Sequence, residues 1–101
     1  MSASISTHVL DTAAGRPAQG VNVQLFVAGD RFEKCLASEW TDEDGRIEQL
    51  VEGLDAGTYS LVFHPPSPFF TRVELQVELG EGHHHIPLLV SPYGCASYRG
   101  S

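Results

Sequence analysis

The chain has few cysteines, and that shortage excludes two classes of protein. Its 101 residues contain two cysteines, Cys35 and Cys95. Two are too few for a small scaffold held by several disulfides, and their spacing is not that of metal ligands. Because disulfides are rare in the cytosol, we expect both side chains to be free thiols.

Positive charge is also scarce. Six lysines and arginines stand against thirteen aspartates and glutamates, which gives a net charge of -7 at neutral pH. Nucleic acids and anionic membranes are bound through clustered lysine and arginine side chains, so neither is expected as a partner. An anionic small molecule would have to be bound locally by single arginine or histidine residues.

Long apolar runs are absent. No stretch reaches the roughly 18 apolar residues that a membrane-spanning helix needs, and Met1 to Ile5 lack the charged and apolar regions of a signal peptide. We therefore expect a cytoplasmic protein. The length predicts one domain over residues 1–101, with a modest core that favours association of subunits.

Turn-forming residues recur at short intervals and divide the chain into strand-length segments. Such spacing is typical of β-sandwiches and barrels. Apolar residues occupy every second position over 21–27, 59–63 and 73–79, which predicts strands with one buried face. In the segment 21–27, the apolar residues predicted to face the core include Val27.

Residues 47–54 break this alternation. Ile47, Leu50, Val51 and Leu54 follow the i, i+3, i+4, i+7 spacing of one face of a helix. The spacing predicts one or two helical turns there.

The C-terminal part of the chain combines an apolar run with a compact set of polar groups. Residues 86–94 are mostly apolar, and Tyr98, Arg99, Gly100 and Ser101 follow shortly after them. Termini usually fray, so a strand-like run in this place predicts a tail that is tied into the structure. A phenol, a guanidinium and a hydroxyl within four residues are suited to holding a small polar ligand.

Five histidines offer groups that titrate near physiological pH and can transfer protons. His8 lies in an expected strand over 6–10. In a strand, His83 and His85 would share one face and His84 the other, so at most two of the triplet share a site. No third metal ligand is indicated by spacing, and no metal site is predicted.

Arg46 follows the acidic turn Asp42, Glu43, Asp44 and Gly45. Two interpretations stay open: the carboxylates of the turn pair with Arg46 at the surface, or its planar guanidinium is free to bind a carboxylate or a delocalised oxyanion. No G-x-S-x-G nucleophile elbow and no glycine-rich phosphate loop accompanies it.

Several segments together resemble a known family. They are Ser6-Thr7-His8-Val9-Leu10-Asp11 with Gly15-Arg16-Pro17-Ala18, Thr41-Asp42 with Gly45-Arg46, the run from His85 to Gly94, and Tyr98-Arg99-Gly100-Ser101. This set resembles the transthyretin-like 5-hydroxyisourate hydrolases over essentially the whole chain. The Tyr-Arg-Gly-Ser ending separates these enzymes from the hormone-carrying transthyretins, which are similar in fold.

The resemblance implies an all-β fold, a transthyretin-like (prealbumin-like) β-sandwich of about eight strands, in which 47–54 is a short strand and turn. It also implies a homotetramer, a dimer of dimers, with substrate sites in the channel between the dimers. The implied activity is hydrolysis of 5-hydroxyisourate to 2-oxo-4-hydroxy-4-carboxy-5-ureidoimidazoline in urate catabolism, with no metal or organic cofactor.

The resemblance further implies roles for single residues. His8, Arg46 and His85 take the positions of the catalytic residues. As a hypothesis, one histidine accepts a proton from the water that attacks the C6 carbonyl, and Arg46 stabilises the oxyanion. Which histidine is the base stays open. The substrate would be oriented by the tail residues Tyr98, Arg99, Gly100 and Ser101.

Two features depart from the family pattern. The segment from His64 to Pro68 leads directly into Phe69 and Phe70, where family members usually carry a longer insert with a short helix. Cys95 stands where the signature commonly has an aromatic residue.

Two other functions are weighed against the enzyme. A transthyretin-like protein that binds a small ligand without hydrolysing it would keep the fold, but the two histidines, Arg46 and the intact tail argue against it. An immunoglobulin-like interaction domain would leave the histidines and the tail unexplained.

Overall fold

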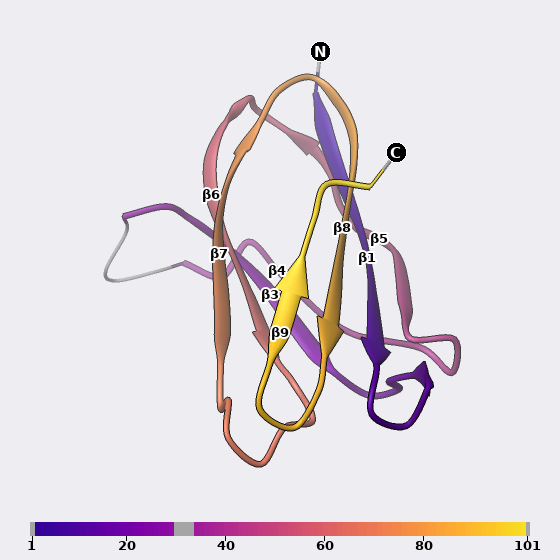
Figure 1. Cartoon of the computed structure of the whole chain (residues 1–101). Coiled ribbons are helices and arrows are strands. Elements are labelled where there is room, and N and C mark those ends of the chain that lie inside the picture. Colours follow the sequence, from indigo (N-terminus) through magenta and orange to yellow (C-terminus); the bar gives the residue numbers. More distant parts are fainter. Residues whose placement is uncertain (1, 30–33, 101) are drawn as a thin grey trace.

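The computed structural model in Figure 1 describes residues 2–29 and 34–100, which fold into two sheets with no helix in these ranges. The first sheet contains β2 (Arg16–Pro17), β1 (Ala3–Asp11), β8 (Gly82–Val90) and β9 (Cys95–Ser97), with β5 (Arg46–Leu54) also paired to β1. The second contains, in order, β4 (Ala37–Trp40), β3 (Asn22–Val27), β6 (Gly57–His64) and β7 (Val73–Leu79). The predicted all-β sandwich is confirmed, and β2 is only a two-residue strand.

One strand pair joins the two ends of the chain. β1 runs parallel to β8, so Ser6 lies opposite His85 and His8 opposite Pro87. On its other side β1 pairs antiparallel with β5, which places His8 opposite Arg46. Three segments that are far apart in the sequence therefore lie side by side, as Figure 1 shows.

The core lies between the sheets and follows the predicted alternation. Val23 and Leu25 of β3 are fully buried, and Leu61 and Phe63 of β6 pack in the same core. Val27 departs from the prediction, because it is 46% exposed. β3 ends at this residue and a turn begins, so the buried stripe stops one position earlier than the alternation indicates.

The helix predicted for 47–54 is wrong, because these residues belong to β5. Val51 lies opposite Ile5 and Ile47 opposite Thr7, so four steps along β5 match two along β1. Extra residues of this kind are β-bulges, which shift the side-chain alternation. Ile47 and the residue three positions later, Leu50, are consequently both buried, at 7% and 6% exposure. Bulges in a strand therefore produced the helix-like spacing.

The connection between β6 and β7 contains no helix, as the short segment after His64 predicted. The Ser67 hydroxyl accepts hydrogen bonds from the backbone N–H groups of Phe69 and Phe70 and donates one to the Pro92 carbonyl at 2.9 Å. The bond to Pro92 ties the connection to the turn between β8 and β9. Nowhere in the described ranges is there a helix long and apolar enough to cross a membrane.

Candidate active site

Three predicted site residues come together on neighbouring strands of the first sheet. His8 on β1 pairs directly with Arg46 on β5, and His85 on β8 lies opposite Ser6, two residues before His8. Because side chains two positions apart point to the same face of a sheet, Ser6 and His8 project from the same face. Strand pairing alone thus brings together His8, Arg46 and His85.

The acidic turn before Arg46 holds the backbone rather than the guanidinium. Asp42 Oδ1 accepts hydrogen bonds from the backbone N–H groups of Asp44 and Arg46, both at 2.9 Å. No carboxylate within the described ranges lies at ion-pair distance from Arg46, since the ion pair found there joins Arg72 to Glu74. Of the two interpretations, the structure therefore favours a guanidinium that is available to a ligand.

The protonation of His8 follows from its partner. His8 Nε2 lies 2.9 Å from the backbone carbonyl oxygen of Asp44. A carbonyl oxygen can only accept a hydrogen bond, so Nε2 must carry the proton. In the neutral ring, Nδ1 is then the nitrogen with a free lone pair.

His85 is held through its ring nitrogen Nδ1, whereas His8 is held through Nε2. His85 Nδ1 lies 2.8 Å from the Ser6 hydroxyl. Burial lowers the pKa of His85, and the nearby Arg46, His8 and His83 lower it further through positive charge. The neutral form, which can accept a proton, is therefore favoured near neutral pH.

The other members of the histidine triplet divide as predicted. His83 shares the face of His85 and contacts both Ser4 Oγ, at 2.7 Å, and Ser6 Oγ, at 2.8 Å. His84 points the other way, is buried, and bonds through Nε2 to the Gly80 carbonyl at 2.9 Å. Within the described part of the chain, no group of three or more acidic, histidine or cysteine side chains is arranged to hold a metal ion.

The two serines were missed by the sequence reasoning. Ser4 and Ser6 occupy alternate positions on β1, as His83 and His85 do on β8. Two such patterns indicate a polar row only once the two strands are known to be neighbours. The pairing of β1 with β8 is not visible in the sequence.

An open depression of about 240 Å³ lies over these strands. Its lining consists of Ser6, Thr7, Arg46, Ile47, Glu48 and His85. Cationic, acidic and neutral hydrogen-bonding groups thus surround one small space, which suits a polar heterocycle rather than an apolar ligand.

In the part of the tail that the structure describes, Gly100 contacts the site. The backbone N–H of Gly100 donates to the His85 carbonyl at 2.7 Å. Tyr98 and Arg99 instead line a larger cavity of about 640 Å³, on the open side of the sandwich where β7 faces β8 and β9. Ser101 lies outside the described residues. The substrate contacts predicted for the tail stay a prediction.

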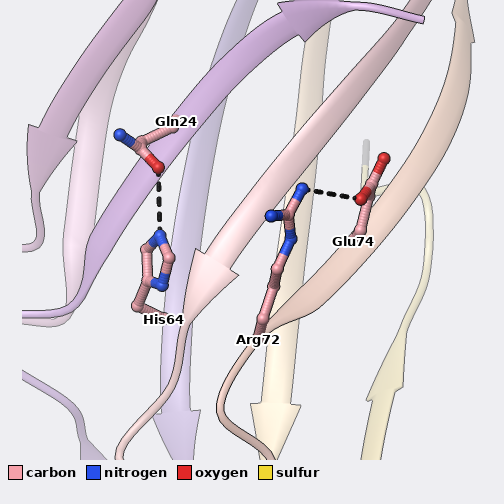
Figure 2. A network of polar contacts seen from close by, with 4 residues as sticks. All are labelled: Gln24, His64, Arg72 and Glu74. Atoms are coloured by element: carbon pink, nitrogen blue, oxygen red, sulfur yellow. Dashed lines mark hydrogen bonds and ion pairs between the residues drawn. The ribbon is translucent and has the colours of Figure 1, made fainter. Parts of the chain in front are cut away.

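The remaining histidine and the two cysteines lie elsewhere. His64, at the end of β6 in the second sheet, donates from Nε2 to Gln24 Oε1 at 3.0 Å, and Figure 2 shows this bond beside the ion pair of Arg72 and Glu74. Cys35 and Cys95 are free and exposed, as expected.

Comparison with known proteins points to one family. The model of the HIUase/Transthyretin family matches residues 5–100. The chain is 38% identical to 5-hydroxyisourate hydrolase 2 of Rhizobium meliloti, over 99% of this chain and 98% of the relative. It is 40% identical to 5-hydroxyisourate hydrolase of Deinococcus radiodurans, over 96% of this chain and 95% of the relative.

Solved structures agree with these relatives. The structure of Klebsiella pneumoniae 5-hydroxyisourate hydrolase superposes with a TM-score of 0.85 at 37% identity, covering 98% of this chain and 99% of the other. Sea bream transthyretin superposes with a TM-score of 0.82 at 24% identity, covering 95% and 93%. The second likeness shows the fold alone, and it confirms the transthyretin-like sandwich.

Proposed function

The chain belongs to the HIUase/Transthyretin family, and from this membership we infer that it hydrolyses 5-hydroxyisourate in urate degradation. The observation that carries this inference is the meeting of His8, Arg46 and His85 on three neighbouring strands. Their chemistry fits the task, because hydrolysis of a cyclic amide needs a base for water and a positive group for the oxyanion.

In the proposed reaction, one of the two histidines takes a proton from water. The resulting hydroxide oxygen bonds to the C6 carbonyl carbon, and the negative charge moves to the carbonyl oxygen, where Arg46 stabilises it. As the carbonyl re-forms, the bond from C6 to N1 breaks, N1 takes the proton held by the histidine, and the new carboxylic acid releases its own proton to solvent to become a carboxylate. His8 Nδ1 and His85 Nε2 are the ring nitrogens without a hydrogen bond to the described chain.

A homotetramer, a dimer of dimers, belongs to the proposal. Ligand sites usually occupy about 300–1,000 Å³ and enclose most of the ligand, whereas the depression beside Arg46 and His85 is open and holds about 240 Å³. A second subunit facing this sheet would close the site, so that 5-hydroxyisourate binds in a channel between subunits. Tyr98, Arg99 and Ser101 are proposed to orient the substrate there.

The activity is tested by generating 5-hydroxyisourate with urate oxidase and following its ultraviolet absorbance with and without this protein. We expect the protein to accelerate the decay. His8→Asn and His85→Asn should each lower kcat/KM by about 10²- to 10⁴-fold, the usual contribution of acid–base catalysis. His64→Asn is the matched control, because His64 lies in the other sheet, and it should retain full activity.

Two results would contradict the proposal. An unchanged decay at micromolar protein would favour a transthyretin-like protein that binds a small ligand without hydrolysing it. Near-normal rates in both histidine variants would reject the mechanism even if the activity is present.

A further inference from the structure

Four side chains form a continuous hydrogen-bonded row along β1 and β8. Ser4 Oγ lies 2.7 Å from His83 Nδ1, His83 Nε2 lies 2.8 Å from Ser6 Oγ, and Ser6 Oγ lies 2.8 Å from His85 Nδ1. The row begins at half-buried Ser4 and exposed His83 and ends at His85, which lines the depression beside Arg46. It therefore connects solvent to the candidate site.

The parallel register of the two strands sets the order of this row. Ser4 lies opposite His83 and Ser6 opposite His85, so hydroxyl and imidazole groups alternate along one face. Both ring nitrogens of His83 have hydroxyl partners, which fixes the orientation of this ring. Ser6 joins the two histidines and is only 8% exposed, so water competes little for its hydroxyl.

Ser6 has one hydroxyl proton and can donate it to only one of the two rings, so two arrangements keep this proton within the row when both rings are neutral. If Ser6 donates to His83 Nε2, it accepts from His85, whose proton is then on Nδ1 and whose Nε2 carries a lone pair. If Ser6 donates to His85 Nδ1, that ring carries its proton on Nε2. The direction of one hydrogen bond thus decides whether His85 offers an acceptor or a donor.

We propose that Ser6 and His83 are positioning residues that hold the proton of His85 on Nδ1, so that Nε2 acts as the base for water. This proposal rests on the proposed hydrolase function and assigns the base that the sequence left open. Arg46 favours the arrangement, because a lone pair is attracted to a neighbouring guanidinium whereas an N–H group is repelled.

The charged and titratable groups around His85 come from three strands. Arg46 and Glu48 line the depression from β5, and His8 and His83 act on His85 from β1 and β8. When Nε2 takes a proton from water, the hydroxide oxygen bonds to C6 of the substrate and His85 becomes an imidazolium. Its Nδ1–H still donates to Ser6, so the cation is stabilised until the proton passes on to N1.

The test combines ¹⁵N NMR of the ring nitrogens, which distinguishes the two tautomers, with steady-state kinetics. In the wild type we expect His85 to carry its proton on Nδ1. Ser6→Ala removes the partner of Nδ1 and should shift His85 toward the Nε2–H tautomer. It should lower kcat about tenfold to a hundredfold, a fraction of the acid–base contribution, with KM changed less than about twofold.

His83→Ala gives a sharper test, because its side chain does not line the depression. Without the acceptor on His83, the Ser6 proton is free to donate to His85 Nδ1, and the tautomer should reverse with a similar loss in kcat. Ser6→Thr keeps a hydroxyl and should retain most of the activity. His64→Ala is the control for the histidine variant, because His64 lies in the other sheet and should leave both the tautomer of His85 and kcat unchanged.

The proposal is overturned if wild-type His85 carries its proton on Nε2, or if Ser6→Ala and His83→Ala leave both tautomer and kcat unchanged. Thermal unfolding of each variant shows whether a loss of rate reflects loss of the fold. Failure of the hydrolase proposal is separate, since it appears as an inactive wild type. In that case a Ser6-dependent Nδ1–H tautomer would leave the hydrogen-bonded row standing and reject only the catalytic role.

Discussion

Among the single residues of the site, the partner of each ring decides what chemistry a histidine can offer. The Asp44 carbonyl occupies Nε2 of His8, and the Ser6 hydroxyl occupies Nδ1 of His85. The two imidazoles therefore present different nitrogens to a ligand, although they are the same residue type. Their reactivity is set by neighbours, one of them a main-chain atom.

The charge of Arg46 should be visible in the titration of His85. Burial is the first cause that lowers the pKa of His85 below the ordinary 6.5, and Arg46 is the second. Arg46→Gln removes a permanent cation, so the pKa of His85 should rise, yet stay below 6.5 because the burial remains. The measurement is an NMR titration of the His85 ring protons. An unchanged or lower pKa in this variant would contradict the assignment.

The same shift has a consequence for stability. A histidine whose pKa is lower in the folded chain binds its proton more tightly when unfolded. The contribution of His85 to stability is therefore complete above the unfolded pKa near 6.5 and is lost as the pH falls through the lower folded pKa. Arg46→Gln should reduce this loss, which chemical denaturation at several pH values can measure.

Gly100 should be intolerant of a side chain. A Cβ at this position would lie 2.6 Å from His85 Cδ2 and 3.1 Å from the His85 carbonyl oxygen. Gly100→Ala must displace either the tail or the imidazole, and a misplacement of about 1 Å can cost about a hundredfold in rate. We expect a fall of that size in kcat/KM with the fold retained.

Gly80→Ala is the matched control for this prediction. A Cβ at Gly80 meets no atom within 4 Å, and its φ is not positive. Wild-type kinetics for both alanine variants would show that Gly100 does not hold His85 in place.

Among the elements, β5 shows why hydrophobic spacing misled the sequence analysis. Two irregularities in its pairing with β1 insert extra residues and change which side chains face the core. Sequence periodicity assumes one regular repeat, so a bulged strand can match a helical template. The bulges depend on the partner strand, and only the pairing shows them.

The turn that leads into β5 is closed by a glycine that no other residue can replace without strain. Gly45 has φ +73°, and a Cβ there would lie 2.5 Å from the Val9 carbonyl oxygen and 2.9 Å from Pro17 Cβ. We expect Gly45→Ala to lower the free energy of unfolding by about 3 kcal/mol, from left-handed strain of about 1–2 kcal/mol together with the clash. Denaturant unfolding measures this change.

Gly53→Ala separates the two causes. Gly53 also has φ +73°, but a Cβ there meets nothing within 4 Å, so only the strain of about 1–2 kcal/mol should appear. Equal losses in the two variants would mean that the contact with Val9 contributes nothing. Because Gly45 precedes Arg46, its variant should also lose activity, whereas Gly53→Ala should not.

At the scale of the whole molecule, the single chain leaves the site open. Arg46 and His85 line one depression while Tyr98 and Arg99 line another cavity. A facing subunit is the simplest way to enclose a substrate and bring further groups to it. The tail and the catalytic residues would then act together only in the assembly.

Sedimentation tests this directly. We expect a particle of four times the 11.0 kDa chain mass. Activity per chain should fall when dilution dissociates the tetramer, because the closed site is then lost. A monomer that is fully active at every concentration would reject the proposed assembly.

The sequence by itself determined much of the local structure. Alternating apolar residues predicted β3, β6 and β7, because a strand between core and solvent needs that repeat. The resemblance carried by the segments around His8 and Arg46, the run from His85 to Gly94 and the Tyr98–Ser101 ending indicated the family, and full-length relatives confirm it. Residue types and short spacings are sufficient for such inferences.

Only the tertiary structure decided which groups meet. The parallel pairing of β1 with β8 places Ser6 beside His85, and the bulged pairing with β5 places Arg46 beside His8. The tautomer of His8 follows from its contact with the Asp44 carbonyl, and the tautomer proposed for His85 depends on its contact with Ser6. Each of these contacts joins segments that are far apart in the chain, so no residue spacing within a single sequence indicates it.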